Sequence, residues 1–446
     1  MSQITIMAKL PKLKGSTPQY KQVVLPTQLF DDIEALGLSN IQKNKAYHFI
    51  DYLMVQSDRK YGMPYCFTSF SYGLFLEIFN SKYMKFVRPL KELGIIDCDE
   101  VFSVDGNKPH NYRVHKDYFT TDDTTTKVQV AYYSNEYDDS EEVITKSVDF
   151  IKSLYIPYDG LREALKQKLY DIAVAEYVTN HGIKEERIKV FDGERHYYIG
   201  RDKAIEKATK WGVEVFEDGG KYFLMDKSEY KKMKLNHIKR SYQTVIENLR
   251  AGNIHVGRNR TNNRLDTNLT NMPSCLYNVI AKANSLMQVD AVNSQYAILA
   301  DIMRNEGIEG DFIKDAQDGN LYENVEQKLN LEDRDAAKKG LMQVIFAPSF
   351  YGGTFKDGLN KIYPELIAFT DGYKEDKGHN QLAIMLQKFE SGMYIDEISN
   401  ELQKNGVECT SKHDSIICRA SDVDVVLDTM KEKMMLNGFV CQLKAS

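Results

Sequence analysis

The most informative stretch of this sequence is Thr261-Asn-Asn-Arg264-Leu-Asp-Thr-Asn268-Leu-Thr-Asn271-Met-Pro273. A short run with the character of a strand, residues 252–256, comes just before it. The stretch is rich in asparagine and ends on proline, a composition typical of a loop. Asparagine side chains also cap helices and close turns, so the stretch alone is compatible with a purely structural role. Its meaning depends on the segments that lie C-terminal to it.

Two aspartates lie further along the chain in strand-like settings. Val289-Asp290 ends one such run and precedes a helical pattern over residues 296–303. Ser411-Lys-His413-Asp414-Ser415 begins a β-type run near the C-terminus, with the acid at its turn. Metal-assisted nucleotidyl transfer needs two such carboxylates, brought together from distant segments.

In this order the three segments resemble the palm of family A (DNA polymerase I type) nucleotidyltransferases. That family reads T-x-x-R-L-x-x-x-x-x-N-L-Q-N-I-P, then an aspartate followed by Ser-Gln, then a lysine-bearing helix, and finally His-Asp-Glu. The resemblance covers roughly residues 230–446. It implies an α+β right-hand polymerase with palm, fingers and thumb, which synthesises DNA in the 5′–3′ direction. It also implies that Asp290 and Asp414 share two Mg²⁺ ions, for which Mn²⁺ can substitute.

The resemblance further implies contacts with a DNA primer–template. Arg264, Asn268 and Asn271 take the places of the family's minor-groove donors. Such donors test the geometry of a base pair without reading sequence, because minor-groove acceptors lie in similar places in every pair. Gln387 lies near the family's primer-contacting glutamine, and His413 would support the primer terminus.

A helix with four-residue spacing is predicted over residues 334–347. Arg334, Lys338, Met342 and Phe346 share one slightly drifting stripe of this helix. The family's fingers helix reads R-x-x-x-K-x-x-x-F-x-x-x-Y-G in the same register. The resemblance therefore implies that the two cations bind a nucleoside triphosphate while Met342 and Phe346 pack on its base. An ordinary amphipathic helix is the alternative.

Two departures leave the choice between dNTP and NTP open. Ser294 and Gln295 lie four and five residues after Asp290, whereas the family has them two and three residues after its aspartate. Ser415 replaces the family's glutamate and resembles the His-Asp-Ser of single-subunit phage-type RNA polymerases. One alternative is therefore a single-subunit RNA polymerase or primase. Another is a non-catalytic replication initiator or DNA-binding protein with a degenerate palm.

Residues 41–119 are predicted to form a winged-helix-like module after an N-terminal arm, residues 1–40. Helical patterns over residues 43–55, 68–79 and 81–93 precede strand patterns over 95–104 and 110–115. In a winged helix the third helix faces DNA. Its cations here are Lys82, Lys85, Arg88 and Lys91, and the loop at Lys108 would be the wing. Such a module can equally dock a protein, so a replication protein is an alternative partner.

Residues 120–145 are rich in Thr, Asp and Glu, which predicts a solvated linker. Residues 146–250 are predicted to be mainly helical and thumb-like, and residues 251–446 to form the palm with small fingers. The helix over residues 231–249 pairs Lys232 with Lys239 and Lys231 with Arg240 near helical spacing. Phosphate binding needs cations on one face, which indicates a DNA-gripping helix.

A β-hairpin is predicted over Ile188–Ile199, with Asp192-Gly193-Glu194 in its turn. The same three residues superficially match the Asp-x-Glu of a proofreading exonuclease. No partner acids occur at useful spacing, so we predict a polymerase without proofreading. Every residue assigned to chemistry lies beyond position 250, which predicts that the chemistry survives removal of residues 1–145.

The composition indicates the number of domains, the cellular location and the state of the cysteines. A chain of 446 residues is expected to hold two to four domains. It has no apolar run long enough for a bilayer and no secretory signal, so we expect a cytoplasmic protein of a bacterial or phage-infected cell, encoded by a phage or mobile element. The six dispersed cysteines favour reduced thiols. A net charge of −6 leaves nucleic-acid binding to the local distribution of cations.

Overall fold

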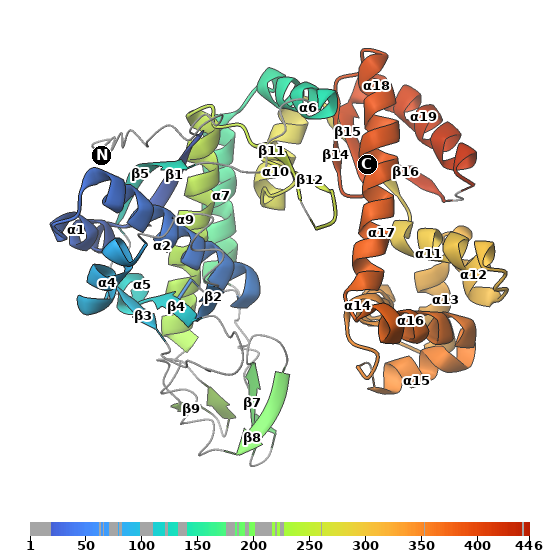
Figure 1. Ribbon diagram of the computed structural model, residues 1–446, viewed down its shortest axis with the longest axis horizontal. Coiled ribbons are helices and arrows are strands. Elements are labelled where there is room, and N and C mark those ends of the chain that lie inside the picture. The colour runs from blue at the N-terminus through green and yellow to red at the C-terminus, as the bar shows by residue number, and fades with distance from the viewer. Residues whose placement is uncertain are drawn as a thin grey trace. The chain divides into compact units, whose positions relative to one another are not determined.

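The chain is α+β and divides into two compact units that are interleaved along the sequence. Unit 1 comprises residues 1–135 and 158–253, and unit 2 comprises residues 136–157 and 254–446. Helices outnumber strands among the described elements, and the sheets are small (Figure 1). The computed structural model describes residues 19–61, 64–65, 67–70, 79, 83–98, 110–120, 124–132, 141–174, 183–184, 187–191, 196–200, 216–218, 221–223, 227–259, 261–351, 353–438 and 441–446.

A two-stranded antiparallel sheet organises unit 1. Strand β1 (Gln19–Pro26) pairs with β5 (Thr125–Tyr132) along its whole length. Val128 and Val130 of β5 are buried, while Gln129 between them is only partly so, which is the period of a strand with one buried face. Residues 120–145 therefore contribute a core strand where we expected a solvated linker. The apolar alternation of Lys-Val-Gln-Val outweighs the polar composition around it.

Helix α9 (Lys227–Arg250) packs along β1. The side-chain amide of Asn248 accepts a hydrogen bond from the backbone N–H of Gln22 and donates one to its carbonyl, both at 2.8 Å. Thr244, one turn earlier, accepts from the backbone N–H of Val24 at 3.2 Å. These bonds satisfy backbone groups of β1 that face away from β5.

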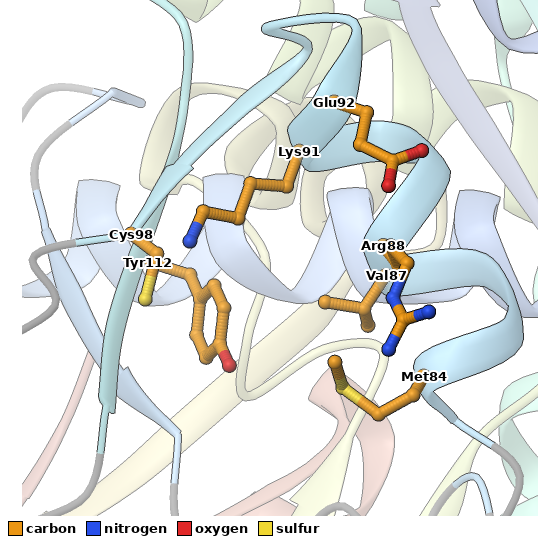
Figure 2. A pocket seen from close by; sticks show the side chains of 7 residues that line it. All are labelled: Met84, Val87, Arg88, Lys91, Glu92, Cys98 and Tyr112. Carbon is orange, nitrogen blue, oxygen red and sulfur yellow. The ribbon is translucent and has the colours of Figure 1, made fainter.

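Residues 41–119, which we predicted to form a winged-helix-like module, lie in unit 1. The expected first and third helices are α2 and α4, and the expected strands are β3 and β4. The expected second helix, residues 68–79, begins instead as strand β2, because Thr68 and Phe70 pair with β4 in a three-stranded sheet of order β2-β4-β3. A groove separates α4 from this sheet (Figure 2). The elements are α1 (Thr27–Ala35), α2 (Asn40–Tyr61), β2 (Thr68–Phe70), α4 (Met84–Glu92), β3 (Ile96–Cys98), β4 (His110–Val114) and α5 (Asp117–Thr120).

The predicted hairpin of unit 1 is confirmed. Ile188 of β7 (Arg187–Phe191) faces Ile199 of β8 (His196–Gly200) in antiparallel register. The turn over 192–195, like the loop at Lys108, the side chain of Lys231 and residue Lys82, lies outside the described residues. The unit also contains α7 (Tyr158–Val174), β6 (Ile183–Lys184), β9 (Phe216–Asp218) and β10 (Lys221–Phe223).

Unit 2 is built on a four-stranded antiparallel sheet of order β14-β15-β13-β16. Its central strands carry the two predicted aspartates, one at the end of β13 and one in the turn before β15. A separate hairpin of β11 and β12 holds the stretch from Thr261 to Pro273, and α6 packs against this hairpin and against β14. These elements are α6 (Glu142–Ser153), β11 (Val256–Arg258), β12 (Leu265–Thr267), α10 (Ser274–Ala283), β13 (Leu286–Ala291), β14 (Cys409–Lys412), β15 (Ser415–Arg419) and β16 (Leu443–Ala445).

A long helix links this sheet to a helical subassembly. Helix α17 continues through the π-helix η1 into α18, contacting α14 and α16 near one end and β14 and β15 near the other (Figure 1). Gly340 lets α14 approach α15 closely, because a Cβ there would lie 2.3 Å from the ring of Phe355. The helices are α11 (Ser294–Asn305), α12 (Asp311–Gln317), α13 (Leu321–Leu329), α14 (Arg334–Phe346), α15 (Gly353–Ile362), α16 (Pro364–Lys377), α17 (Gln381–Ser391), η1 (Gly392–Ser399), α18 (Asn400–Lys404), η2 (Ala420–Asp422) and α19 (Val423–Leu436).

None of the described helices has both the length and the apolar character that crossing a membrane requires.

Candidate active site

Asp290 and Asp414 come together on neighbouring strands of the unit 2 sheet. Asp290 lies opposite Ser415 in the antiparallel register of β13 and β15, and Asp414 directly precedes Ser415. The backbone N–H of Ala291 donates to the carbonyl oxygen of Asp414 at 3.2 Å. Residues 124 positions apart in sequence thus lie side by side, because hairpin β14–β15 places its turn beside the end of β13.

The carboxylates lie in a crowded, partly buried environment. Burial raises the pKa of Asp414 to about 6, and the charges of Glu390 and Asp290 contribute in the same direction. Asp290 is oriented by Gln288, whose side-chain amide donates to its Oδ1 at 2.7 Å. These residues share one face of β13, since they are two positions apart. Negative charge therefore accumulates where β13 ends and β15 begins.

Glu390 is a site residue that the sequence analysis missed. It lies on α17 with only 1% of its side chain exposed, and it forms an ion pair with Arg264. Its other oxygen accepts a hydrogen bond from the hydroxyl of Ser294 at 3.2 Å. Arg264 is held beside the aspartates, since its charge also acts on the pKa of Asp414. Glu390 thus ties the predicted minor-groove arginine to the start of α11.

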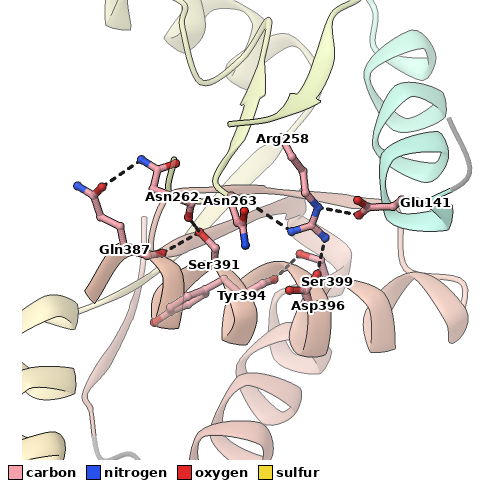
Figure 3. A network of polar contacts seen from close by, with 9 residues as sticks. All are labelled: Glu141, Arg258, Asn262, Asn263, Gln387, Ser391, Tyr394, Asp396 and Ser399. Atoms are coloured by element: carbon pink, nitrogen blue, oxygen red, sulfur yellow. Dashed lines mark hydrogen bonds and ion pairs between the residues drawn. The ribbon is translucent and has the colours of Figure 1, made fainter. Parts of the chain in front are cut away.

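The stretch after β11 is fastened to the long helix at further points (Figure 3). The side-chain amide of Asn262 donates to Gln387 at 3.0 Å, and the hydroxyl of Ser391 donates to the carbonyl of Asn262 at 2.8 Å. Arg258 pairs with Glu141 at the start of α6, at 2.6 Å, and with Asp396 on η1. Gln387 therefore lies beside the Arg264 loop, as a shared primer contact would require.

The two predicted asparagines of this stretch differ in their surroundings. The Oδ1 of Asn268 accepts a hydrogen bond from the backbone N–H of His255 at 2.6 Å, which closes the β11–β12 hairpin. Asn271 has an exposed side chain. Asn268 therefore has a structural role in addition to any contact with nucleic acid, whereas Asn271 faces solvent.

His413 lies in the β14–β15 turn with a left-handed backbone, φ 58°. Burial lowers its pKa, and the positive charges of Arg264 and Lys412 act in the same direction. The ammonium of Lys412 sits 4.3 Å from the ring centre of Tyr277. Lys412 also lies within electrostatic reach of Asp290, whose charge opposes the lowering of the lysine pKa by burial. An imidazole and an ammonium therefore flank the two aspartates.

The predicted stripe on α14 is exposed along its length. Arg334, Lys338, Met342 and Phe346 all face solvent, while Ala337, Gly340, Leu341, Val344 and Ile345 face the core. Arg334 binds Glu323 at 2.6 Å and lies 4.8 Å from the ring centre of Tyr322. Burial raises the pKa of Tyr322 to about 12; the charge of Arg334 opposes this rise, and the charges of Asp414 and Glu323 add to it. Tyr322 therefore contacts Arg334 and lies within electrostatic reach of Asp414.

The donor set suits magnesium held in part by its substrate. Within the described chain, no three His, Cys, Asp or Glu side chains group so as to hold a metal ion. Mg²⁺ is usually held by one or two carboxylates together with water and substrate phosphates, not by a cage of protein ligands. Asp290 and Asp414 fit this mode, because burial, together with the charges of Glu390 and Asp290, raises the pKa of Asp414, and a bound cation would offset that effect.

The predicted cations of unit 1 have different accessibilities. On α9, Lys232 is exposed and Lys239 is half-buried. Arg240 is 4% exposed and stacks 4.7 Å from the ring centre of Phe119, and burial lowers its pKa to about 9. The expectation that Arg240 grips phosphate is therefore wrong, since its guanidinium faces the core. On α4, both Lys85 and Arg88 are exposed.

No protein-family model matches this sequence. The search of curated proteins likewise gives no match.

Proposed function

We propose that unit 2 is a template-directed nucleotidyltransferase that extends a DNA primer in the 5′–3′ direction by a two-metal mechanism. The observation that carries the proposal is the meeting of Asp290 and Asp414 at the ends of adjacent strands. Other residues of unit 2 support the proposal. Arg264 pairs with Glu390, Gln387 bonds to Asn262 of the same loop, and Arg334 contacts Tyr322, which lies within electrostatic reach of Asp414.

In the proposed reaction, the primer 3′-hydroxyl oxygen forms a bond to the α-phosphorus of the nucleotide. The bond from that phosphorus to the bridging oxygen breaks, pyrophosphate leaves, and the hydroxyl proton passes to solvent. Mg²⁺ bound by Asp290 and Asp414 would supply charge stabilisation to the attacking and leaving oxygens. Lys338 and Arg334 would bind the triphosphate, and Met342 and Phe346 would provide apolar surface for the base.

The choice of nucleotide is part of the proposal's test. Two residues more than the family pattern lie between Asp290 and Ser294, and the backbone of Asn293 there is left-handed, with φ 56°. Ser294 donates its hydroxyl to Glu390, so this segment is fixed at the edge of the site. The altered spacing between Asp290 and Ser294, together with Ser415 in place of the family's glutamate, is the observation that favours the RNA polymerase or primase alternative.

The test is primer extension on a simple template, with dNTPs or NTPs, with or without primer, and in Mg²⁺ or Mn²⁺. Asp290→Asn and Asp414→Asn should each abolish incorporation and leave the circular dichroism spectrum unchanged. Asp357→Asn is the matched control, because Asp357 is an exposed aspartate on α15 to which the proposal gives no role. Near-normal incorporation by either active-site variant would refute the two-metal assignment. A folded wild-type protein that incorporates neither kind of nucleotide would favour the non-catalytic alternative.

A further inference from the structure

The groove between α4 and the sheet of unit 1 has the character of a ligand site. Its volume is about 610 Å³, within the range of pockets that bind small molecules. Its residues come from α4 on one side and from β3 and β4 on the other (Figure 2). They are Met84, Val87, Arg88, Lys91, Glu92, Cys98 and Tyr112.

The lining combines an apolar floor with a cationic rim. Val87 and Tyr112 are nearly fully buried and supply the floor, while Met84 is 43% exposed and forms an apolar wall. Tyr112 is braced from behind, since its ring meets that of Phe49 edge-to-face at 5.6 Å. The floor therefore does not depend on a ligand for its position.

The two cations lie one helical turn apart. Lys91 extends from α4 toward Cys98 and Tyr112, and Arg88 lies beside Met84 nearer the start of the same helix (Figure 2). Arg88 is exposed and has no ion pair within the described chain, not even with Glu92 four residues later. An unpaired guanidinium at the mouth of an apolar groove favours a ligand with an anionic group attached to a flat apolar one.

We propose that this groove binds a nucleotide, with its base against the floor and its phosphate on Arg88 and Lys91. The favoured source is an unpaired nucleotide within single-stranded nucleic acid, because Lys85 extends the line of cations along α4 beyond the groove. Proteins that bind single-stranded nucleic acid combine aromatic or apolar surface, against which bases stack, with cations that bind the phosphate backbone. Such binding differs from duplex contact by α4, in which the outward face of the helix, and not the groove, would carry the affinity.

The test uses Cys98 as a local reporter, since it lines the groove and forms no disulfide. Alkylation of Cys98 by N-ethylmaleimide is followed by mass spectrometry of the full-length protein without divalent metal. Oligo(dT) of about twelve nucleotides should slow Cys98 alkylation roughly fivefold or more at saturation. An oligomer of equal length and charge without bases should protect much less. Cys275 and Cys441, both half-buried in unit 2, are the internal references.

Substitutions on α4 distinguish binding in the groove from binding on the outer face of the helix. Arg88→Ala should remove the protection, and Met84→Ala should weaken it. Lys85→Ala should weaken the protection much less than Arg88→Ala, because Lys85 lies beyond the groove. Lys166→Ala is the matched control and should leave the protection unchanged, because Lys166 is an exposed cation on α7 that does not line the groove. Equal loss of protection in Arg88→Ala and Lys85→Ala would overturn the proposal in favour of duplex-type contact.

Two further probes identify the source of the ligand. Thymidine monophosphate that protects Cys98 as well as oligo(dT) would assign the groove to a free nucleotide. Protection by an acidic peptide but not by oligo(dT) would overturn the proposal. The proposal concerns unit 1 alone, so its outcome is distinguishable from that of primer extension by the Asp290→Asn variant.

Discussion

Arg264 and Glu390 form an ion pair between residues 126 positions apart, and Glu390 is almost completely buried. The pair joins the loop after β11 to the long helix at the point where the two aspartates meet. A buried charge without its partner costs far more than the intact pair contributes, because desolvation is no longer compensated. The removal of either side chain should therefore destabilise the fold, because it leaves the other charge without its partner.

Glu390→Ala and Arg264→Ala are each expected to lower the free energy of unfolding by roughly 3 kcal/mol. The double variant should lose clearly less than the sum of the two, because it leaves no unpaired buried charge. Urea unfolding monitored by circular dichroism measures these changes. Glu375→Ala, an exposed acid on α16, is the control and should have little effect. Additive losses would show that the two side chains do not interact in solution.

Asp414 is expected to reduce the stability of the metal-free protein at neutral pH. Its pKa is raised from 3.8 to about 6 in the folded chain, so the folded state holds the proton more tightly than the unfolded state. The stability gained from that proton is fully present below pH 3.8 and is lost as the pH rises through 6.

Asp414→Asn removes this dependence. At pH 8 it should raise the free energy of unfolding by roughly 1–2 kcal/mol, allowing for solvent screening, and the gain should shrink toward pH 4. Urea unfolding in EDTA at several pH values measures the effect, with Asp357→Asn as the control. A variant that is less stable than the wild type at pH 8 would contradict the crowding of carboxylates around Asp414.

Lys338 is expected to bind the nucleotide triphosphate, whereas its neighbour Lys339 is not. Both side chains are exposed on α14, but they point about 100° apart around the helix. Lys338→Ala should reduce kcat/KM for nucleotide incorporation roughly tenfold or more, since it removes a charge-assisted contact. Lys339→Ala should change it much less. Steady-state primer extension gives the ratio, and the reverse ranking would place the stripe in another register.

The placement of the aspartates can be predicted from local sequence, and that of Glu390 cannot. Asp290 and Asp414 each adjoin a strand-like run, so a short antiparallel sheet is enough to bring them together. The importance of Glu390 arises from a contact with a residue far away in sequence. The one local signal for Glu390 is its position around the helix. It lies four residues after Leu386 and eight after Leu382, so it continues their buried stripe. An acid on the apolar stripe of a helix indicates a buried partner.

The errors of the fold prediction also come from long-range pairing. The helical spacing over 68–79 gives way at Thr68–Phe70, because β4 offers these residues a strand partner. The acidic composition of 120–145 hides strand β5, whose partner β1 lies about a hundred residues earlier. Composition and periodicity report on neighbours along the chain, so neither pattern reveals a partner strand of this kind.

Interleaving of the units predicts that a fragment of residues 146–446 will not fold properly by itself, contrary to the boundary expected from sequence. The fragment lacks β1 and β5, against which α9 packs. It also lacks Lys127, which pairs with Glu247 of α9 at 2.6 Å. In unit 2 it loses Glu141, the partner of Arg258, and the buried residues Val143 and Ile144 of α6.

The fragment should therefore show reduced helicity by circular dichroism, rapid proteolysis within α9, and association on size exclusion through its exposed apolar residues. Adding a separately expressed fragment of residues 1–145 tests whether the missing segments cause the defect. Because residues 1–145 carry β1, β5 and the start of α6, mixing them with the 146–446 fragment should restore helicity and protease resistance. A monomeric 146–446 fragment with full helicity and normal primer extension would show that the segments before residue 146 are dispensable, and that the contacts of β1 with α9 contribute little to stability.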